Sequence, residues 1–209
     1  MSLWVIIPVK PLRRSKSKLT NILSEEDRAI LYLNLYENTL KALKQIKVPH
    51  QVLVVSKDSS VLSLARSYNA KTLQEDGDSG LNLALKKAIQ VVKAYSAQSV
   101  LILPADLPFI TKEDIEGVME YSVEYSFMLI SPDRKMSGTN LLFMSPPDMI
   151  DFSYGPGSFE RHVRQAQAQN VHLEVRKFDS AELDIDSPED FELYKKLINF
   201  EDKNQYLRI

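Results

Sequence analysis

Asp106 is the first residue whose type and position could support chemistry. It follows the apolar run at residues 101–103, which reads as a buried strand, and it lies between Pro104 and Pro108. In an open α/β sheet, ligands bind just beyond the carboxyl ends of the strands, so a carboxylate there can hold a metal ion on the phosphates of a ligand. The structural alternative is that Asp106 only caps a turn.

A second pair of carboxylates comes from Asp184 and Asp186. They alternate with apolar residues in the segment LDID, so an extended backbone places both on the same side. Two such carboxylates repel each other unless a cation lies between them, which together with Asp106 favours Mg²⁺. Asp186 or Ser187, before Pro188, can instead start a helix, and this alternative stays open for one of the two acids.

Positive charge gathers in the segment PVKPLRRSKSKLT, residues 8–20. Its cations are Lys10, Arg13, Arg14, Lys16 and Lys18. Because the segment follows the first expected strand, it should lie near Asp106, where it would stabilise a triphosphate and a departing pyrophosphate. The alternative is a solvated basic loop. The sequence has neither a Walker A loop nor a GxGxxG segment, so P-loop and dinucleotide-binding mechanisms are disfavoured.

Small and polar residues are concentrated between residues 131 and 162. They include Gly138, Thr139, Asn140, Gly155, Gly157 and Ser158. Ser158 is expected to cap the helix that follows, whose free amides would favour a phosphate or a carboxylate. A side chain at Gly155 would fill the space that a phosphate must enter. His162, one turn into the helix, either donates to the ligand or packs in the core.

Short apolar strands alternate with longer amphipathic helices along the chain. Strands are expected at residues 3–7, 51–55, 70–73, 100–103, 127–130, 140–144 and 172–175. Helices are expected at residues 25–46, 60–68, 80–95, 113–121, 157–169 and 188–198. This alternation predicts a single α/β domain over residues 1–209, with a mostly parallel, twisted sheet and helices on both faces.

Composition argues against several classes of function. The 209 residues carry a net charge of -2 with a pI near 6.0, which gives no electrostatic case for nucleic acid or an anionic membrane. The lack of cysteine excludes disulfides, zinc–thiolate sites and cysteine nucleophiles. The first apolar run, residues 3–8, is too short for a signal peptide and no later run approaches a membrane span, so a cytoplasmic location is expected.

Several segments together resemble a known family. In chain order they are IPVKPL, SKSKL, LPADLP, SGTN, FSYGPGSFERH and LDIDSPED. This set resembles the 2-phospho-L-lactate guanylyltransferase family, which serves coenzyme F420 biosynthesis, and it covers nearly the whole chain. The resemblance implies a fold like that of the nucleotide-diphospho-sugar transferases. It also implies transfer of GMP from GTP to 2-phospho-L-lactate, giving lactyl-2-diphospho-5'-guanosine and pyrophosphate; related members use phosphoenolpyruvate.

The resemblance also implies roles for individual residues. They are Asp106, Asp184 and Asp186 for Mg²⁺; Thr139, Gly155 and Ser158 for the acceptor, a small phosphorylated three-carbon acid; and Lys10, Arg13, Lys18, Gly80 and Asn82 for the nucleotide. Of these, Lys10, Lys18 and Asp106 would take part in catalysis. The family often has arginine where this chain has Lys18, and a lysine keeps the charge but loses bidentate phosphate geometry.

Three other functions remain open. Another nucleotidyltransferase, acting on a sugar or pterin phosphate, would share the fold and metal site, but such enzymes usually carry a glycine-rich loop after the first strand. A glycosyltransferase could use Asp184 and Asp186 as its metal motif, although that motif normally ends a mid-sheet strand, where this chain has Asp106. A non-catalytic nucleotide-binding regulator belongs to a different class. The acceptor and the strictness for guanine stay open, and a homodimer is a working expectation.

Overall fold

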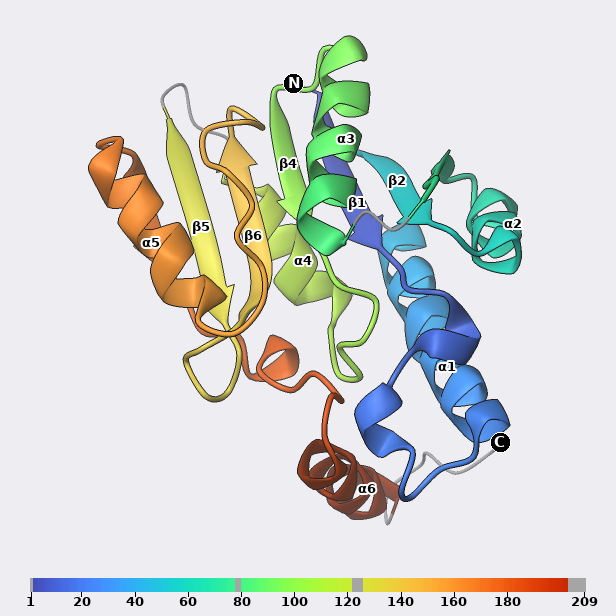
Figure 1. Ribbon diagram of the computed structural model, residues 1–209. Helices are drawn as coiled ribbons and strands as arrows, with labels where there is room; N and C mark the ends of the chain where they lie inside the picture. Colours follow the sequence, from blue (N-terminus) through green and yellow to red (C-terminus); the bar gives the residue numbers. More distant parts are fainter. Residues whose placement is uncertain (1, 78–79, 122–125, 203–209) are drawn as a thin grey trace.

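One seven-stranded sheet forms the centre of the molecule. The computed structural model describes residues 2–77, 80–121 and 126–202 (Figure 1). In these ranges the strand order is β3-β2-β1-β4-β6-β5-β7. The strands are β1 (Leu3–Pro8), β2 (Gln51–Ser56), β3 (Lys71–Gln74), β4 (Ser99–Ile102), β5 (Phe127–Pro132), β6 (Thr139–Ser145) and β7 (His172–Val175). The predicted single domain, residues 1–209, includes residues outside the described ranges.

Helices cover both faces of the sheet. They are α1 (Glu25–Lys44), α2 (Ser59–Ser67), α3 (Leu81–Ala94), α4 (Lys112–Met119), α5 (Ser158–Ala168) and α6 (Pro188–Asp202), with short 3-10 turns η1 (Leu12–Arg14), η2 (Ser17–Leu19) and η3 (Asp179–Ala181). Helices α1, α2 and α4 pack into the apolar core on one face, and α3 and α5 pack into the core on the other. The predicted α/β fold, with a mostly parallel sheet between two helical layers, is confirmed. Within the described ranges, none of the helices combines the length and apolar character needed to cross a membrane.

Strand β1 illustrates why a continuous apolar run forms a central strand. Val5 and Ile7 join the core under α1, whereas Trp4 and Ile6 join the core under α3. Because successive side chains point to opposite faces, a strand buried on both faces must be apolar at every position.

Strand β6 runs in the opposite direction to its neighbours β4 and β5, and this direction determines where its first residues lie. It runs antiparallel to β4 and β5, while β1, β2, β3 and β4 run parallel to one another. An antiparallel strand starts at the edge where its parallel neighbours end. Thr139 and Asn140, the first residues of β6, therefore lie at the same edge as Pro104 and Asp106, which follow β4.

A small third apolar cluster holds the basic segment against the C-terminal acids. Leu19, Leu35 and Ile185 are almost fully buried against one another, and α6 packs on them through Phe191. This contact joins residues far apart in sequence, so that the cations near Leu19 face the carboxylates on either side of Ile185.

Helix α6 settles which residue near Pro188 starts the helix. The Ser187 amide donates to Asp190 Oδ2 at 2.9 Å, and the Asp190 amide donates to Ser187 Oγ at 3.3 Å. This reciprocal pair satisfies amides at the helix start, with Pro188 at the first helical position. Ser187 is therefore the cap, and the Asp186 carboxylate points elsewhere.

Candidate active site

A cavity of about 610 Å³ opens over the carboxyl edge of the sheet. Segments following β1, β2, β3 and β4 line it, together with the start of β6, the loop before α5 and the acids that precede α6. Nine of the predicted site residues belong to the lining: Lys10, Lys18, Gly80, Asp106, Thr139, Gly155, Ser158, Asp184 and Asp186. Arg13 and Asn82 do not belong to it, whereas Arg14 does.

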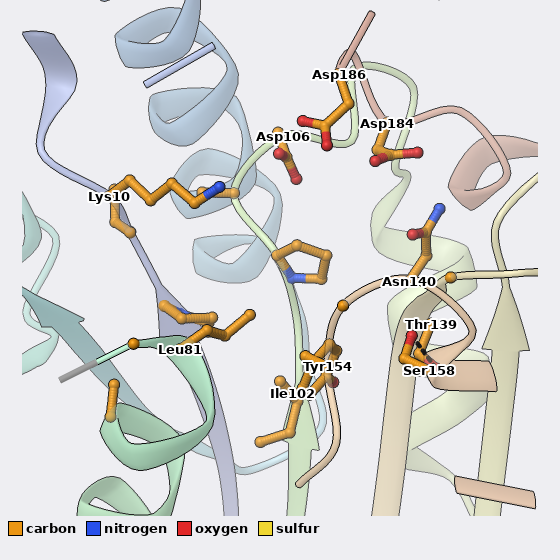
Figure 2. Close-up of a pocket in the computed structure, with 18 of the residues that line it drawn as sticks. Lys10, Leu81, Ile102, Asp106, Thr139, Asn140, Tyr154, Ser158, Asp184 and Asp186 are labelled. Atoms are coloured by element: carbon orange, nitrogen blue, oxygen red, sulfur yellow. Dashed lines mark hydrogen bonds between the residues drawn. The ribbon is translucent and has the colours of Figure 1, made fainter. Parts of the chain in front are cut away.

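The three predicted aspartates converge on one region, where Figure 2 shows their carboxylates pointing toward a common space. The cation among them is Lys16, whose Nζ lies 2.7 Å from Asp106 Oδ2 and 3.4 Å from Asp186 Oδ1. Its side chain is only 2% exposed, whereas that of Lys18, 3.7 Å from Asp186 Oδ2, is 68% exposed. We call Lys16, Asp106, Asp184 and Asp186 the aspartate cluster.

Burial and like charges set the electrostatics of the aspartate cluster. Burial, followed by the nearby charges of Asp106 and Asp186, raises the pKa of Asp184 to about 7. Burial also opposes ionisation of Asp186, but the charges of Lys16, Lys10 and Lys18 hold its pKa below the usual value. Three carboxyl groups thus lie around one buried ammonium, with the exposed Lys10 and Lys18 nearby, and the repulsion between the carboxylates disfavours ionisation of Asp184.

The aspartate cluster fits a divalent cation that is shared with a ligand. Among the residues that the structure describes, no three or more His, Cys, Asp or Glu side chains are arranged to hold a metal ion by themselves. Mg²⁺ commonly uses one or two carboxylates together with substrate phosphates and water, rather than a cage made only of protein. Three carboxyl groups in the lining of one cavity suit this mode, and Mg²⁺ binding by Asp106, Asp184 and Asp186 stays a prediction.

A second group of polar side chains lies across the cavity at the start of β6 and α5. Thr139, Ser158 and His162 are buried, and their polar atoms bond to one another. We call these three residues the hydroxyl cluster. Figure 2 shows Thr139 beside Ser158, joined by a hydrogen bond.

The hydrogen bonds of His162 fix the orientation of the Thr139 hydroxyl. The Ser153 amide donates to Nε2 at 3.0 Å, so the proton of the neutral imidazole is on Nδ1, which donates to Thr139 Oγ1 at 3.0 Å. Ser158 Oγ donates to the same oxygen at 3.3 Å. Thr139 Oγ1 therefore accepts two hydrogen bonds, and its own proton is left for an acceptor in the cavity.

His162 acts behind the cavity and not in its lining. Its ring is fully buried, and burial, with a smaller effect of the Arg161 charge, lowers its pKa to about 4, which keeps it neutral. Of the two expectations for this residue, packing in the core is the one that the structure supports. Sequence alone could not distinguish them, because the decisive partners are Thr139 and Ser153.

The start of α5 differs from the sequence-based expectation in two ways. The cap residue is Gly157, with φ +74°, and Ser158 is the first helical residue, so the predicted capping role of Ser158 is wrong. The Ser158 amide donates to Gly155 O and the Phe159 amide donates to Ser137 O, so these two amides are already used. The hydroxyl of Thr139 is the better-supported donor for an anion.

Gly155 adopts a backbone conformation that favours glycine. Its φ is +118°, a conformation that side chains other than glycine rarely adopt. A Cβ there would meet only Arg161 Nη2, at an ordinary 3.9 Å, so within the protein the constraint on this position is its backbone. That a side chain at Gly155 would occupy the space of a bound phosphate stays a prediction, and Gly155 does line the cavity. The Arg161 guanidinium holds this loop by donating to the carbonyls of Ser153 and Pro156.

Asn82 uses its amide within the protein. Its Nδ2 donates to Tyr154 O at 3.2 Å, and its Oδ1 accepts from the Tyr154 amide at 2.7 Å. Asn82 therefore joins the first turn of α3 to the loop before α5, while its neighbour Gly80 lines the cavity. The predicted contact between Asn82 and the nucleotide has no support in this geometry.

Solved structures place the fold in a class. The chain is similar to a putative nucleotide-diphospho-sugar transferase from Desulfovibrio desulfuricans, with a TM-score of 0.77, 16% identity and coverage of 98% of this chain and 92% of that one. A nucleotidyl transferase from Methanothermobacter gives a TM-score of 0.65 at 13% identity, with coverage of 98% and 99%. At these identities the similarity shows the fold alone, which is that of the nucleotide-diphospho-sugar transferases.

Sequence comparison then identifies the family. The chain belongs to the family described as guanylyl transferase CofC like, whose model matches residues 3–208. A phosphoenolpyruvate guanylyltransferase from Rubrobacter xylanophilus is 40% identical over 190 residues, covering 91% of this chain and 92% of the relative. A 2-phospho-L-lactate guanylyltransferase from Methanocaldococcus vulcanius is 37% identical over 187 residues, covering 89% and 81%.

Proposed function

We propose that the protein transfers GMP from GTP to a phosphorylated three-carbon acid, either 2-phospho-L-lactate or phosphoenolpyruvate, in coenzyme F420 biosynthesis. The observation that carries the proposal is that the three acids of the aspartate cluster and the two hydroxyls of the hydroxyl cluster line one cavity at the carboxyl edge of the sheet. Membership of the guanylyl transferase family and the names of the two relatives above support the same reaction.

The reaction would proceed by direct displacement. An oxygen of the acceptor's phosphate attacks the α-phosphorus of GTP in line, a new P–O bond forms, and the bond to pyrophosphate breaks with its electrons on the departing oxygen. A phosphate dianion is already a competent nucleophile near neutral pH, so no side chain has to remove a proton. The protein's contribution is to position two anionic ligands and reduce their repulsion.

Residues of this chain would divide that work between the two ligands. Lys10 and Lys18 line the cavity and would neutralise the charge that develops on pyrophosphate. Thr139, with its free proton directed by the hydroxyl cluster, would donate to the acceptor. Asp106 and its two partner acids would hold Mg²⁺, which when bound supplies positive charge that neutralises phosphate oxygens.

Pyrophosphate release tests this function directly. Purified protein with Mg²⁺ is given GTP, ATP, CTP or UTP, each paired with 2-phospho-L-lactate, phosphoenolpyruvate or glucose 1-phosphate. The expected result is fast release with GTP and one of the three-carbon acids, and little release with the sugar phosphate. Equal turnover with the sugar phosphate, or GTP binding without release, would contradict the proposal, and the second outcome would favour a regulator.

The remaining predictions from the sequence concern the number of domains, the oligomeric state and the cellular location. The single domain over residues 1–209 is supported by the one sheet that contains every described strand. A homodimer and a cytoplasmic location stay predictions, to be measured by light scattering and by cell fractionation.

A further inference from the structure

Glu75 lies at the end of the cavity farthest from the hydroxyl cluster in strand order. It follows β3 directly, and its amide donates to Ser56 O at 3.1 Å, which fixes its backbone beside the end of β2. The neighbouring lining residues at this end are Val55, Lys57, Gly80, Leu81 and Ala84. None of the roles assigned so far uses Glu75.

The carboxylate of Glu75 has an unused acceptor. Its Oε1 is buried, and no described residue donates a hydrogen bond to that atom. Buried polar atoms are nearly always paired, so an unpaired one on a residue that lines a cavity indicates a missing donor. Burial raises the pKa of Glu75, while the charges of Lys57 and Lys87 act in the opposite direction.

The same end of the cavity offers an apolar surface. Leu81, at the first position of α3, is 39% exposed and lines the cavity, as does the buried Ala84 one turn later. Figure 2 shows Leu81 on the opposite side of the cavity from Thr139 and Ser158, with Asp106 above them near Asp184 and Asp186. A flat ring could lie against this surface with its edge toward Glu75.

The spacing of the strands indicates where the base, the phosphates and the acceptor would lie along the cavity. β3 and β6 are four positions apart in the strand order, which corresponds to about 19 Å at the usual strand spacing. Lys10 and Asp106, after β1 and β4, lie between these ends. With the acceptor at β6 and the phosphates at the centre, the base of the nucleotide falls at β3.

We propose that the Glu75 carboxylate recognises guanine by accepting hydrogen bonds from its N1–H and its 2-amino group, while Leu81 packs on the face of the ring. This inference rests on the proposed transfer of GMP. A carboxylate accepts and does not donate, so it suits these two adjacent donors. Adenine presents an unprotonated, acceptor N1 and no 2-amino group at this edge, and it would leave the buried carboxylate unpaired.

Inosine triphosphate provides the sharpest probe, because it differs from GTP only by the missing 2-amino group. We expect wild-type kcat/KM, measured by pyrophosphate release, to be about 10- to 100-fold higher with GTP than with ITP, the range for one hydrogen bond to a charged group. In Glu75→Ala the GTP to ITP ratio should fall to near one. Glu75→Gln keeps the shape and one acceptor, and its ratio should be intermediate.

Asp76→Ala is the matched control. Asp76 is the next residue, is exposed and lies outside the cavity lining, so its removal should leave the GTP to ITP ratio unchanged. Thermal unfolding separates recognition from a structural role. Removing a carboxylate that has one buried oxygen without a hydrogen bond should keep or raise the melting temperature of Glu75→Ala, whereas loss of a structural ion pair would lower it.

The outcomes distinguish this inference from the proposed function. Equal wild-type kcat/KM for GTP and ITP, or an unchanged ratio in Glu75→Ala, would overturn the role of Glu75 while the transfer reaction stands. If wild type releases no pyrophosphate with any pair of substrates, the proposed function fails, and calorimetry with GDP and IDP in the presence of Mg²⁺ still tests Glu75. A wild-type preference for GDP that disappears in Glu75→Ala supports the role, and equal binding of GDP and IDP refutes it.

Discussion

Residues of the aspartate cluster and of the hydroxyl cluster line the same cavity, but the electrostatics of the two clusters differ. In the first, three carboxyl groups compete for the ammonium of Lys16, and burial raises the pKa of Asp184 to about 7. In the second, His162 is neutral and both of its ring nitrogens are hydrogen-bonded. One cluster contains carboxylates that repel one another, whereas the other is neutral.

This difference indicates how each cluster contributes to binding. Repulsion between neighbouring carboxylates is unfavourable in the free protein and is relieved when a cation binds between them, so the aspartate cluster has an affinity for positive charge. A satisfied neutral network has nothing to gain from a counterion, and instead holds one donor, the Thr139 hydroxyl, in a fixed direction. Charge compensation and preorganisation are thus separated in space, and each can be tested alone.

The largest expected effect comes from Asp184→Asn. Removing this carboxylate should lower the rate of pyrophosphate release by about 1,000-fold, equivalent to about 4 kcal/mol, because a cation would lose a ligand near the transferring phosphate. The free energy of unfolding in urea should stay the same or rise, because the change removes a buried carboxyl group that is repelled by its neighbours. Asp148→Asn, which removes an exposed partner of Lys93, is the control. Activity within a few-fold of wild type would show that Asp184 plays no part.

The next effect is a pH dependence of stability from His162. Its pKa is about 4 in the folded protein and about 6.5 when unfolded, so the unfolded state binds more protons between these values. This contribution to stability is complete above pH 6.5 and is lost as the pH falls toward 4, to a total of about 3 kcal/mol.

Urea unfolding of wild type and His162→Asn between pH 8 and pH 4 measures this pH-dependent contribution of His162 to the free energy of unfolding. The asparagine can still donate to Thr139 but does not titrate, so the difference between the two proteins should shrink as the pH falls. His50→Asn serves as the control and should follow wild type. A pH-independent difference between wild type and His162→Asn would show that the buried histidine does not carry this dependence.

A smaller loss is expected from Lys16→Met. The apolar side chain retains much of the buried stem but leaves Asp106 and Asp186 without their closest cation. We expect a loss of about 2 kcal/mol in the free energy of unfolding, below the range for fully buried pairs because both aspartates are partly exposed. Lys18→Met, at a side chain that is 68% exposed, should change stability by less than about 0.5 kcal/mol. Equal effects of the two variants would contradict the unequal roles seen in the structure.

The smallest effect is expected from Thr139→Val. Loss of the hydroxyl should raise the KM for the acceptor by about 10-fold, equivalent to about 1.4 kcal/mol, and leave the KM for GTP unchanged. Thr139→Ser keeps the hydroxyl and should remain close to wild type. Ser158→Ala should give a change in the same direction but smaller, because Ser158 acts by orienting Thr139. A shift in the KM for GTP would place Thr139 in the nucleotide region instead.

The sequence predicted the parts of the site that follow from strand ends. Asp106 could be placed because a buried apolar run precedes it and a proline stops the strand. The two C-terminal acids could be paired because alternation puts them on one side. Thr139 was identified for its hydroxyl, but its position depends on the reversal of β6, since the start of a parallel strand would lie at the opposite edge.

Other residues of the site depend on contacts that no local pattern contains. Lys16 looks like its four neighbouring cations in sequence, and only its left-handed backbone, at φ 51°, and the packing of Leu19 distinguish it. The partner of Asn82 is 72 residues away. Glu75 carried one usable signal, a carboxylate two residues after the strand expected at residues 70–73, but that strand is short and lies at the edge of the sheet.

The two hydrogen bonds between Asn82 and Tyr154 connect the start of α3, at the proposed nucleotide end of the cavity, to the loop before α5, at the proposed acceptor end. Helix α3 begins beside Gly80, and Tyr154 directly precedes Gly155, so a ligand that shifts either segment strains the same pair of bonds. Thermodynamic linkage makes any resulting cooperativity reciprocal: the factor by which the nucleotide changes affinity for the acceptor is the factor by which the acceptor changes affinity for the nucleotide. A single asparagine thereby offers a route to coupled loading of the two ligands.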